Sequence, residues 1–293
     1  MPLNGVLVVD KPAGWTSHDV VAKARNLLGE RSIGHLGTLD PMATGVLPLV
    51  LGRMTRLGQF YSSSEKGYEG TIRLGIATDT YDADGDPVGE EQDVNVTLEV
   101  VRNCSNEFLG LIKQVPPTFS AKKIKGVPAY KFARKKQQVE LPPVEVEVKE
   151  LSIDGLGAAL VPFHCRVSSG TYVRSIAHEL GQKLGVGAHL ASLRRTAVAE
   201  FSIDQSHTLQ EIAETSARGA VEELLFHPRK VLPEIPSVTA TDEDIAKIRH
   251  GRTVNLPEMS RSRWVKVFAG QAELVCLASR VAGTLFHPKV VLI

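Results

Sequence analysis

The chain has 293 residues, and its 34 Lys and Arg against 33 Asp and Glu give a formal net charge of +1. With this balance any nucleic-acid-binding surface must be local, and no apolar run approaches the roughly 18–20 residues that span a bilayer. The length suffices for one large domain, alone or with a smaller one. The three cysteines are scattered, and residues 1–5 lack the basic and apolar regions of a signal peptide. We therefore expect a cytoplasmic protein without a disulfide framework.

A strand and a helix are expected at the start of the chain. Residues 5–10 form a short apolar run, rich in β-branched side chains, that predicts a buried strand. Residues 11–15 turn the chain, and Thr16 or Ser17 then caps a helix that runs to about residue 28. On physical grounds alone, Lys11 is a solvated lysine of this turn.

Residues 34–48 hold a single acid, Asp40, among apolar neighbours. A lone carboxylate in such surroundings is costly unless it is paired. One interpretation is that Asp40 caps a helix beginning at Pro41, although that helix would meet Gly45 within about one turn and Pro48 soon after. The other interpretation is a carboxylate placed for chemistry. The spacing alone leaves both open.

The next elements follow from alternation and periodicity. Residues 46–52 form another apolar run, residues 55–60 predict a short helix, and residues 66–75 alternate like a strand. The acidic stretch 79–86 fails the calcium-loop pattern, because its glycine comes too early and the final bidentate glutamate is absent. We expect a polar hairpin turn there. Residues 97–109 predict an amphipathic helix.

A basic run marks the middle of the chain. Seven Lys or Arg lie between residues 122 and 136 with no intervening acid, and Phe119, Tyr130 and Phe132 are interleaved with them. Such a run is often only a solvated surface. Basic groups with aromatic rings also suit RNA, by neutralising phosphates and stacking on bases.

The second half predicts further strands and helices. Residues 144–151 alternate like a half-exposed strand, and residues 163–177 predict a strand, a turn and a helix that runs to residue 184. A proline-rich connector follows at 226–236. A short helix at 242–249 and strands at 264–268, 273–277 and 283–292 complete the chain. Phosphate-binding glycine loops and metal-ligand spacings are absent from the sequence, so we expect neither a nucleotide cofactor nor a metal.

Four motifs resemble, in the same order, those of the TruB family, the tRNA pseudouridine-55 synthases. They are K-P-x-G-x-T-S from Lys11, G-H-x-G-T-L-D-P-x-A-T-G-V-L-P from Gly34, K-x-Y from Lys66 and S-x-G-T-Y-V-R-S from Ser168. S-A-K-K at 120–123 and L-R-R-T at 193–196 continue the resemblance, which spans residues 5 to about 235.

The resemblance implies a role for individual residues. Asp40 would be the catalytic nucleophile, Arg174 would pair with it, and Tyr68 would stack on the target uracil and is a candidate base. His35 would stabilise the RNA around the flipped base. The other expected substrate-site residues are Tyr172 beside the base, Leu193 on the pocket wall, Lys123 near the active site and Lys11, which mainly supports the architecture.

The resemblance also implies an α/β (α+β) fold. Residues 1–235 would form a pseudouridine synthase domain with a mixed, largely antiparallel sheet and a basic thumb insertion at about 116–143, and residues 236–293 a small PUA-like RNA-binding β domain. It implies a monomer that needs no cofactor or metal and acts on uridine 55 in the TΨC arm of tRNA. Two alternatives are a guide-RNA-dependent pseudouridine synthase and a non-catalytic tRNA-binding or chaperone protein.

Overall fold

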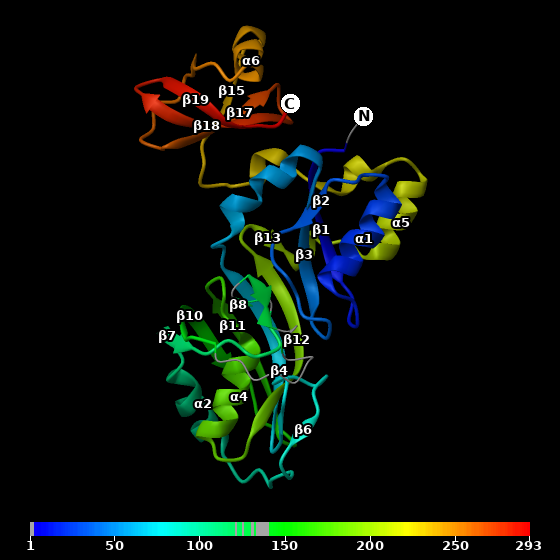
Figure 1. Ribbon diagram of the computed structural model, residues 1–293, viewed down its shortest axis with the longest axis vertical. Coiled ribbons are helices and arrows are strands. Elements are labelled where there is room, and N and C mark those ends of the chain that lie inside the picture. The colour runs from blue at the N-terminus through cyan, green and yellow to red at the C-terminus, as the bar shows by residue number, and fades with distance from the viewer. Residues whose placement is uncertain (1–2, 121, 125, 130–131, 133–140) are drawn as a thin grey trace.

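The computed structural model describes residues 3–120, 122–124, 126–129, 132 and 141–293. Two β-sheets dominate the elongated molecule, a large one in the body and a small one at the C-terminal end (Figure 1). Helices in the described part of the chain are all too short or too polar to cross a membrane.

The large sheet is mixed and largely antiparallel, as predicted. Only β12 and β3 run parallel among its pairs. Its path is β14 (Leu225–Phe226), β1 (Gly5–Lys11), β3 (Thr44–Leu51), β12 (Ala188–Val198), β4 (Lys66–Leu74), β11 (Leu160–Val167), β10 (Val144–Ile153) and β7 (Gly110–Gln114), with β2 (Ile33–His35) on β3 and β13 (Phe201–Ser202) on β12.

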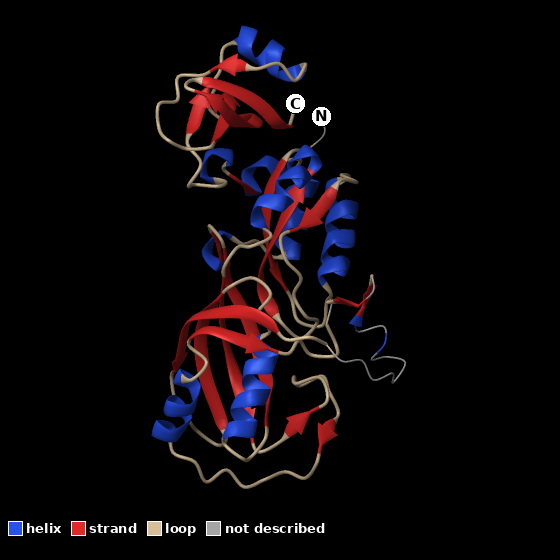
Figure 2. Ribbon diagram, turned by 60° about the vertical axis from the view of Figure 1, so that its left-hand side comes forward, coloured by secondary structure: helices blue, strands red, loops and turns tan. Residues whose placement is uncertain are grey.

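Two pairs of helices pack on this sheet and on each other. At one end α1 (Ser17–Leu28) lies beside α5 (Leu209–Ala217), and at the other α2 (Leu98–Asn106) lies beside α4 (Val173–Lys183) (Figures 1 and 2). The start of α1 is the predicted one, because Thr16 and Asp19 form a reciprocal capping box. The helix ends at Gly29, whose φ of 62° is the left-handed value that glycine adopts most readily.

Short elements connect these layers. The predicted polar hairpin is present, since β5 (Ala77–Thr78) pairs with β6 (Pro87–Val88). The helix expected at 55–60 is a longer 3₁₀ helix, η1 (Gly52–Tyr61). The remaining short elements are β8 (Lys123–Ile124), β9 (Val127–Pro128), η2 (Ile203–Gln205), η3 (Val221–Leu224) and η4 (Pro228–Lys230).

The C-terminal sheet has the order β15 (Ser237–Thr239), β17 (Trp264–Ala269), β18 (Glu273–Ala282), β19 (Leu285–Val291) and β16 (Val254–Asn255). The helix α6 (Asp242–Arg249) has the predicted bounds. This small β domain has its own buried core, which includes Ile248, Val265 and Phe286. A second hydrophobic cluster is shared between the two sheets and joins Val6, Val8 and Leu57 to Phe268 and Leu277. The overall α+β class, with a small C-terminal β domain, is therefore confirmed.

The long strand β12 was not predicted, although it lies at the centre of the large sheet. Its register shifts between Leu190 and Ser192 and again between Arg195 and Ala197. Each irregularity interrupts the alternation of inward and outward side chains that identifies a strand in a sequence. The two central arginines, Arg194 and Arg195, weaken the apolar signal further.

Candidate functional site

Asp40 lies in the loop between β2 and β3, and the loop contains no helix. The backbone NH of Ala43 donates to the Asp40 carbonyl at 3.1 Å, and β3 begins at Thr44. The helix-cap interpretation of Asp40 is therefore wrong. Gly45 allows the loop to lie against β12, because a Cβ there would stand 2.2 Å from the carbonyl oxygen of Arg195, and its φ of +97° also disfavours other residues.

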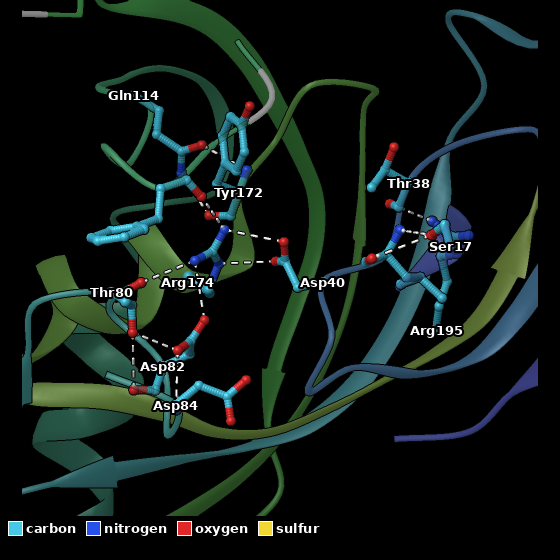
Figure 3. Close-up of polar contacts among 12 residues, drawn as sticks. Ser17, Thr38, Asp40, Thr80, Asp82, Asp84, Gln114, Tyr172, Arg174 and Arg195 are labelled. Atoms are coloured by element: carbon cyan, nitrogen blue, oxygen red, sulfur yellow. Dashed lines mark hydrogen bonds and ion pairs between the residues drawn. The ribbon is translucent and has the colours of Figure 1, made fainter. Parts of the chain in front are cut away.

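The Asp40 carboxylate is held by a guanidinium from the distant α4. Arg174 Nε lies 2.9 Å from Asp40 Oδ2, and Arg174 Nη2 lies 3.2 Å from Asp40 Oδ1 (Figure 3). The predicted pairing of these residues, which are 134 positions apart, is confirmed. Arg174 is 5% exposed and Asp40 is 37% exposed, so one side of the carboxylate remains accessible. This bidentate contact fixes the orientation of both carboxylate oxygens.

A second carboxylate, which the sequence did not single out, holds the other side of Arg174. Asp82 is 4% exposed, and its Oδ2 lies 3.1 Å from Arg174 Nη1. Its Oδ1 accepts hydrogen bonds from Thr80 Oγ1 at 2.6 Å and from the Asp84 NH at 3.2 Å. The guanidinium also donates to the carbonyls of Thr80 and Phe119, each at 3.1 Å. Nη1 and Nη2 of Arg174 are therefore each held by two acceptors.

Burial and the neighbouring charges both change the pKa of Asp40. Its surroundings raise the pKa of Asp40 above the ordinary value, chiefly through desolvation. The Arg174 guanidinium opposes this rise, whereas the nearby Asp82 adds to it. Arg174 thus favours the ionised form of Asp40, which a nucleophile requires.

The exposed side of Asp40 opens into a pocket of about 400 Å³. Most of the predicted site residues line it, namely His35, Asp40, Tyr68, Tyr172, Arg174 and Leu193, and the structure adds Tyr61, Lys66 and Ser120. Tyr68 comes from β4 and Leu193 from the neighbouring β12. The backbone of Tyr172 is fixed by Gln114, whose side-chain amide exchanges two hydrogen bonds with it at 2.8 and 3.0 Å. The rings of Tyr68 and Tyr172 and the apolar side chain of Leu193 thus line the pocket around a carboxylate, an arrangement that suits a flat base.

Arg195 supports the Asp40 loop from within the sheet. Its side chain is fully buried and donates to the carbonyls of Gly37 at 3.1 Å, Thr38 at 3.3 Å and Val46 at 2.7 Å. Its positive charge also opposes the rise that burial causes in the pKa of Tyr68. Sequence reasoning placed Arg195 within a motif but gave it no role.

Lys11 and Lys123 lie differently from the pocket residues. Lys11 is fully buried beneath the loop, where its Nζ donates to the carbonyls of Pro12 at 2.9 Å, Trp15 at 2.5 Å and Pro41 at 3.1 Å. Burial lowers the pKa of Lys11 to about 8. It supports the loop, and the solvated-lysine interpretation is wrong. The backbone of Lys123 lies in β8, but its side chain is outside the described part of the chain.

The basic run falls largely outside the described residues. Lys125, Tyr130, Lys131, Arg134, Lys135 and Lys136 belong to the segments that the structure does not describe. Lys122 is exposed and Phe132 is half-buried. For the described residues, no cluster of three or more His, Cys, Asp or Glu side chains could hold a metal ion.

The chain matches two family models. Residues 25–173 match the N-terminal domain of the TruB family pseudouridylate synthases, and residues 174–232 match the C-terminal domain of tRNA pseudouridylate synthase B. The tRNA pseudouridine synthase B of Solibacter usitatus is 46% identical over 99% of this chain and 100% of its own length. That of Thermobifida fusca is 41% identical over 96% of each chain.

Two solved structures share the fold of this chain. A chain in the crystal structure of a Cbf5–Nop10–Gar1 complex superimposes with a TM-score of 0.72 at 26% identity, over 99% of this chain and 85% of that one. A chain in an H/ACA RNP bound to a substrate RNA has the same TM-score at 24% identity and supports the fold alone. The family models and the bacterial relatives cover most of the sequence, so the chain belongs to the TruB family of pseudouridylate synthases.

Proposed function

We propose that this protein converts uridine 55 in the TΨC arm of tRNA to pseudouridine, with Asp40 as the nucleophile. The observation that carries the proposal is the Asp40 carboxylate, paired with Arg174 and open on one side to a pocket lined by Tyr68, Tyr172 and Leu193. The relatives that match over nearly the whole chain are tRNA pseudouridine synthases B. Their substrate class is the reason to choose tRNA.

The target base must leave the RNA stack before Asp40 can reach its sugar. Extruding a nucleotide costs a few kcal/mol. In the proposed reaction Tyr68 and Tyr172 stack on the uracil, and stacking of this kind contributes roughly 1–3 kcal/mol per base. His35, which lines the same pocket, stabilises the distorted RNA, and Leu193 closes the pocket against water.

The reaction is an isomerisation and therefore needs no co-reactant. The bond between N1 of uracil and C1′ of the ribose breaks, and ionised Asp40 acts on the sugar through either a covalent adduct or a glycal intermediate. The uracil rotates, C5 bonds to C1′, the proton on C5 is removed and N1 takes up a proton, so the product has the same atoms as the substrate. Tyr68 is the candidate base for the C5 proton, because its side chain lies in the pocket and the charge of Arg195 favours its ionised form. Residues 1–235 would carry this chemistry.

Two further regions would bind the rest of the RNA. The thumb at about 116–143, with Lys123 at its start, would contact the backbone through its basic side chains. The PUA-like domain at 236–293 would add a second RNA-binding surface. The protein would act as a cytoplasmic monomer without metal or cofactor.

The test is to incubate the pure protein with unmodified tRNA, without guide RNA, nucleotide or divalent metal, and to map pseudouridine along the product. We expect one modified site, at position 55. Activity that required a guide RNA would instead support the guide-dependent class. Binding without any modified uridine would support a non-catalytic tRNA-binding protein. The assay therefore separates the three functions.

A further inference from the structure

The 3₁₀ helix η1 (Gly52–Tyr61) joins the large sheet to the C-terminal domain. The ring of Phe60 packs edge-on against Trp264 of β17, with centroids 5.3 Å apart and planes at 89°. Arg56 donates a hydrogen bond from Nη1 to the carbonyl of Val291 at the end of β19. In Figure 1 this light blue helix lies directly below the C-terminal domain.

The apolar side of η1 is buried in the cluster that both sheets share. Met54, Leu57 and Tyr61 of the helix are at most 4% exposed. From the C-terminal domain, that cluster receives Phe268, Leu274, Leu277, Val290 and Leu292. The helix and the C-terminal domain therefore share one buried cluster, while the backbone of η1 packs mainly on β1, β2 and β3.

The far end of η1 forms part of the pocket beside Asp40. Gly58, Tyr61 and the following Ser62 are among the residues that line this pocket. The carbonyl of Ser62 accepts a hydrogen bond of 2.7 Å from Ser169, which lies in the turn before Tyr172. One short helix thus contacts the C-terminal domain on one side and the pocket on the other.

Glu200 gives the pocket residue Tyr61 a second connection to the C-terminal domain. Its Oε1 accepts hydrogen bonds from the Tyr61 hydroxyl and, at 2.8 Å, from the backbone NH of Leu232 in the connector. Lys266 of β17 is 1% exposed and donates to the connector carbonyls of Val231 at 2.6 Å and Arg229 at 3.0 Å. The connector is therefore fixed from both domains.

The helix type explains why η1 depends on these contacts. A 3₁₀ helix has poor hydrogen-bond geometry, and runs beyond three or four residues are uncommon. At ten residues, with glycines at positions 52 and 58, η1 has little stability of its own. Its position must come from tertiary packing, which β1, β2 and β3 supply together with the contacts of Phe60 and Arg56 to the C-terminal domain.

We propose that the C-terminal domain positions the pocket wall through η1, and that it thereby sets the rate of the chemical step as well as the affinity for RNA. Trp264, Arg56 and Glu200 are positioning residues in this account, since they act on the pocket through Tyr61 and Ser62. The inference rests on the proposed function for its catalytic readout only. A domain that merely bound RNA would change affinity and leave the rate at saturating RNA unaltered.

The test compares three variants of the full-length chain. Trp264→Ala removes the ring under Phe60, Trp264→Phe keeps an aromatic ring there, and Met259→Ala is the matched control at a side chain that is 83% exposed. We expect Trp264→Ala to slow single-turnover pseudouridine formation at saturating tRNA roughly tenfold, because small displacements of a site cost large factors in rate. Its tRNA dissociation constant should stay within about twofold. Trp264→Phe should recover most of the rate, and Met259→Ala should match the parent.

A second pair of variants tests the hydrogen-bonded connection. Glu200→Ala leaves the Tyr61 hydroxyl and the Leu232 NH without their acceptor, whereas Glu200→Gln keeps an oxygen at that position. We expect the rate to fall for Glu200→Ala and to recover in Glu200→Gln. An unchanged saturated rate in Trp264→Ala and Glu200→Ala, with or without weaker tRNA binding, would overturn the proposal.

Hydrogen exchange gives a readout that is independent of catalysis. Amides at 52–62 should exchange faster in Trp264→Ala than in Met259→Ala, while those of the distant α2 stay unchanged. If the parent formed no pseudouridine but this segment still loosened, the proposed function would fail and the coupling would stand. Equal protection at 52–62 in both variants would overturn the coupling.

Discussion

Replacing Arg174 by lysine tests the arrangement around Asp40 while keeping the positive charge. Arg174 donates hydrogen bonds from Nη1 and Nη2 to four acceptor groups, which are the carboxylates of Asp40 and Asp82 and the carbonyls of Thr80 and Phe119, and its Nε forms an ion pair with Asp40. A lysine offers one nitrogen with three donors and no planar fork. It therefore cannot hold both oxygens of Asp40 and also satisfy the other three groups.

The size of the effect follows from the contact that is lost. A hydrogen bond to a charged group contributes about 1.5–3 kcal/mol. If the bidentate contact with Asp40 becomes a single one, and that energy is needed to orient the carboxylate in the transition state, turnover should fall roughly 10- to 150-fold. Binding of tRNA should change little, because Arg174 is 5% exposed.

The pH dependence of the rate should also change in these variants, and in a direction that the structure predicts. Burial raises the pKa of Asp40, and Arg174 opposes that rise. A less well placed charge in Arg174→Lys, or none in Arg174→Met, lets the pKa of Asp40 rise further. Because the reaction requires the ionised carboxylate, the acid limb of the rate profile should move to higher pH in both variants, and further in Arg174→Met.

The assay is single-turnover pseudouridine formation across pH, with tRNA affinity and thermal unfolding measured in parallel. Arg166→Lys is the matched control, since Arg166 lies on β11 with a side chain that is 50% exposed and pairs only at the surface. The control should keep the parent's rate. An Arg174→Lys protein with the parent's rate and pH profile would refute the role assigned to the guanidinium.

Three other predictions concern the neighbours of this pair and the thumb. Asp82→Asn should slow turnover at unchanged tRNA affinity, because it weakens the hold on Arg174, and a normal single-turnover rate would contradict this. Tyr68→Phe should bind tRNA but turn over slowly if the hydroxyl removes the C5 proton, whereas Tyr68→Leu should lose stacking as well; an active Tyr68→Phe enzyme would exclude the proton role. Neutralising four basic side chains of the thumb together should flatten the dependence of tRNA affinity on salt; the four are Lys131, Arg134, Lys135 and Lys136. An unaltered slope would count against the thumb contacting RNA.

Local signals in the sequence predicted the elements with regular periodicity. The apolar run at 5–10 became β1, and the capping box at Thr16 began α1. The helix α6 has the predicted bounds, an acidic first turn and a Thr241 cap. These elements are decided by neighbouring residues. The strand β12 was missed because its two bulges break the alternation on which such predictions depend.

Some residues of the site could be predicted from the sequence, whereas others depend on contacts that only the fold creates. The pairing of Asp40 with Arg174 was predicted from the family resemblance and is confirmed by the distances. Nothing in the acidic hairpin distinguished Asp82 from its neighbours, since only the fold brings it to a guanidinium 92 residues away. Physical reasoning alone gave a solvated Lys11, as is usual for a lysine beside a proline turn, whereas the resemblance gave it a supporting role. Here three carbonyls converge on its Nζ, an arrangement that requires the Asp40 loop to fold over it.

The most direct test of the central claim compares the parent protein with Asp40→Asn on unmodified tRNA. The amide keeps the size of the side chain but is not a nucleophile, so the variant should bind tRNA with the parent's affinity. The measurement is pseudouridine at position 55 after a long incubation with enzyme in excess, on protein verified free of deamidation. We predict complete conversion by the parent and none by Asp40→Asn. Pseudouridine formed by the verified Asp40→Asn protein would contradict the assignment of Asp40 as the nucleophile.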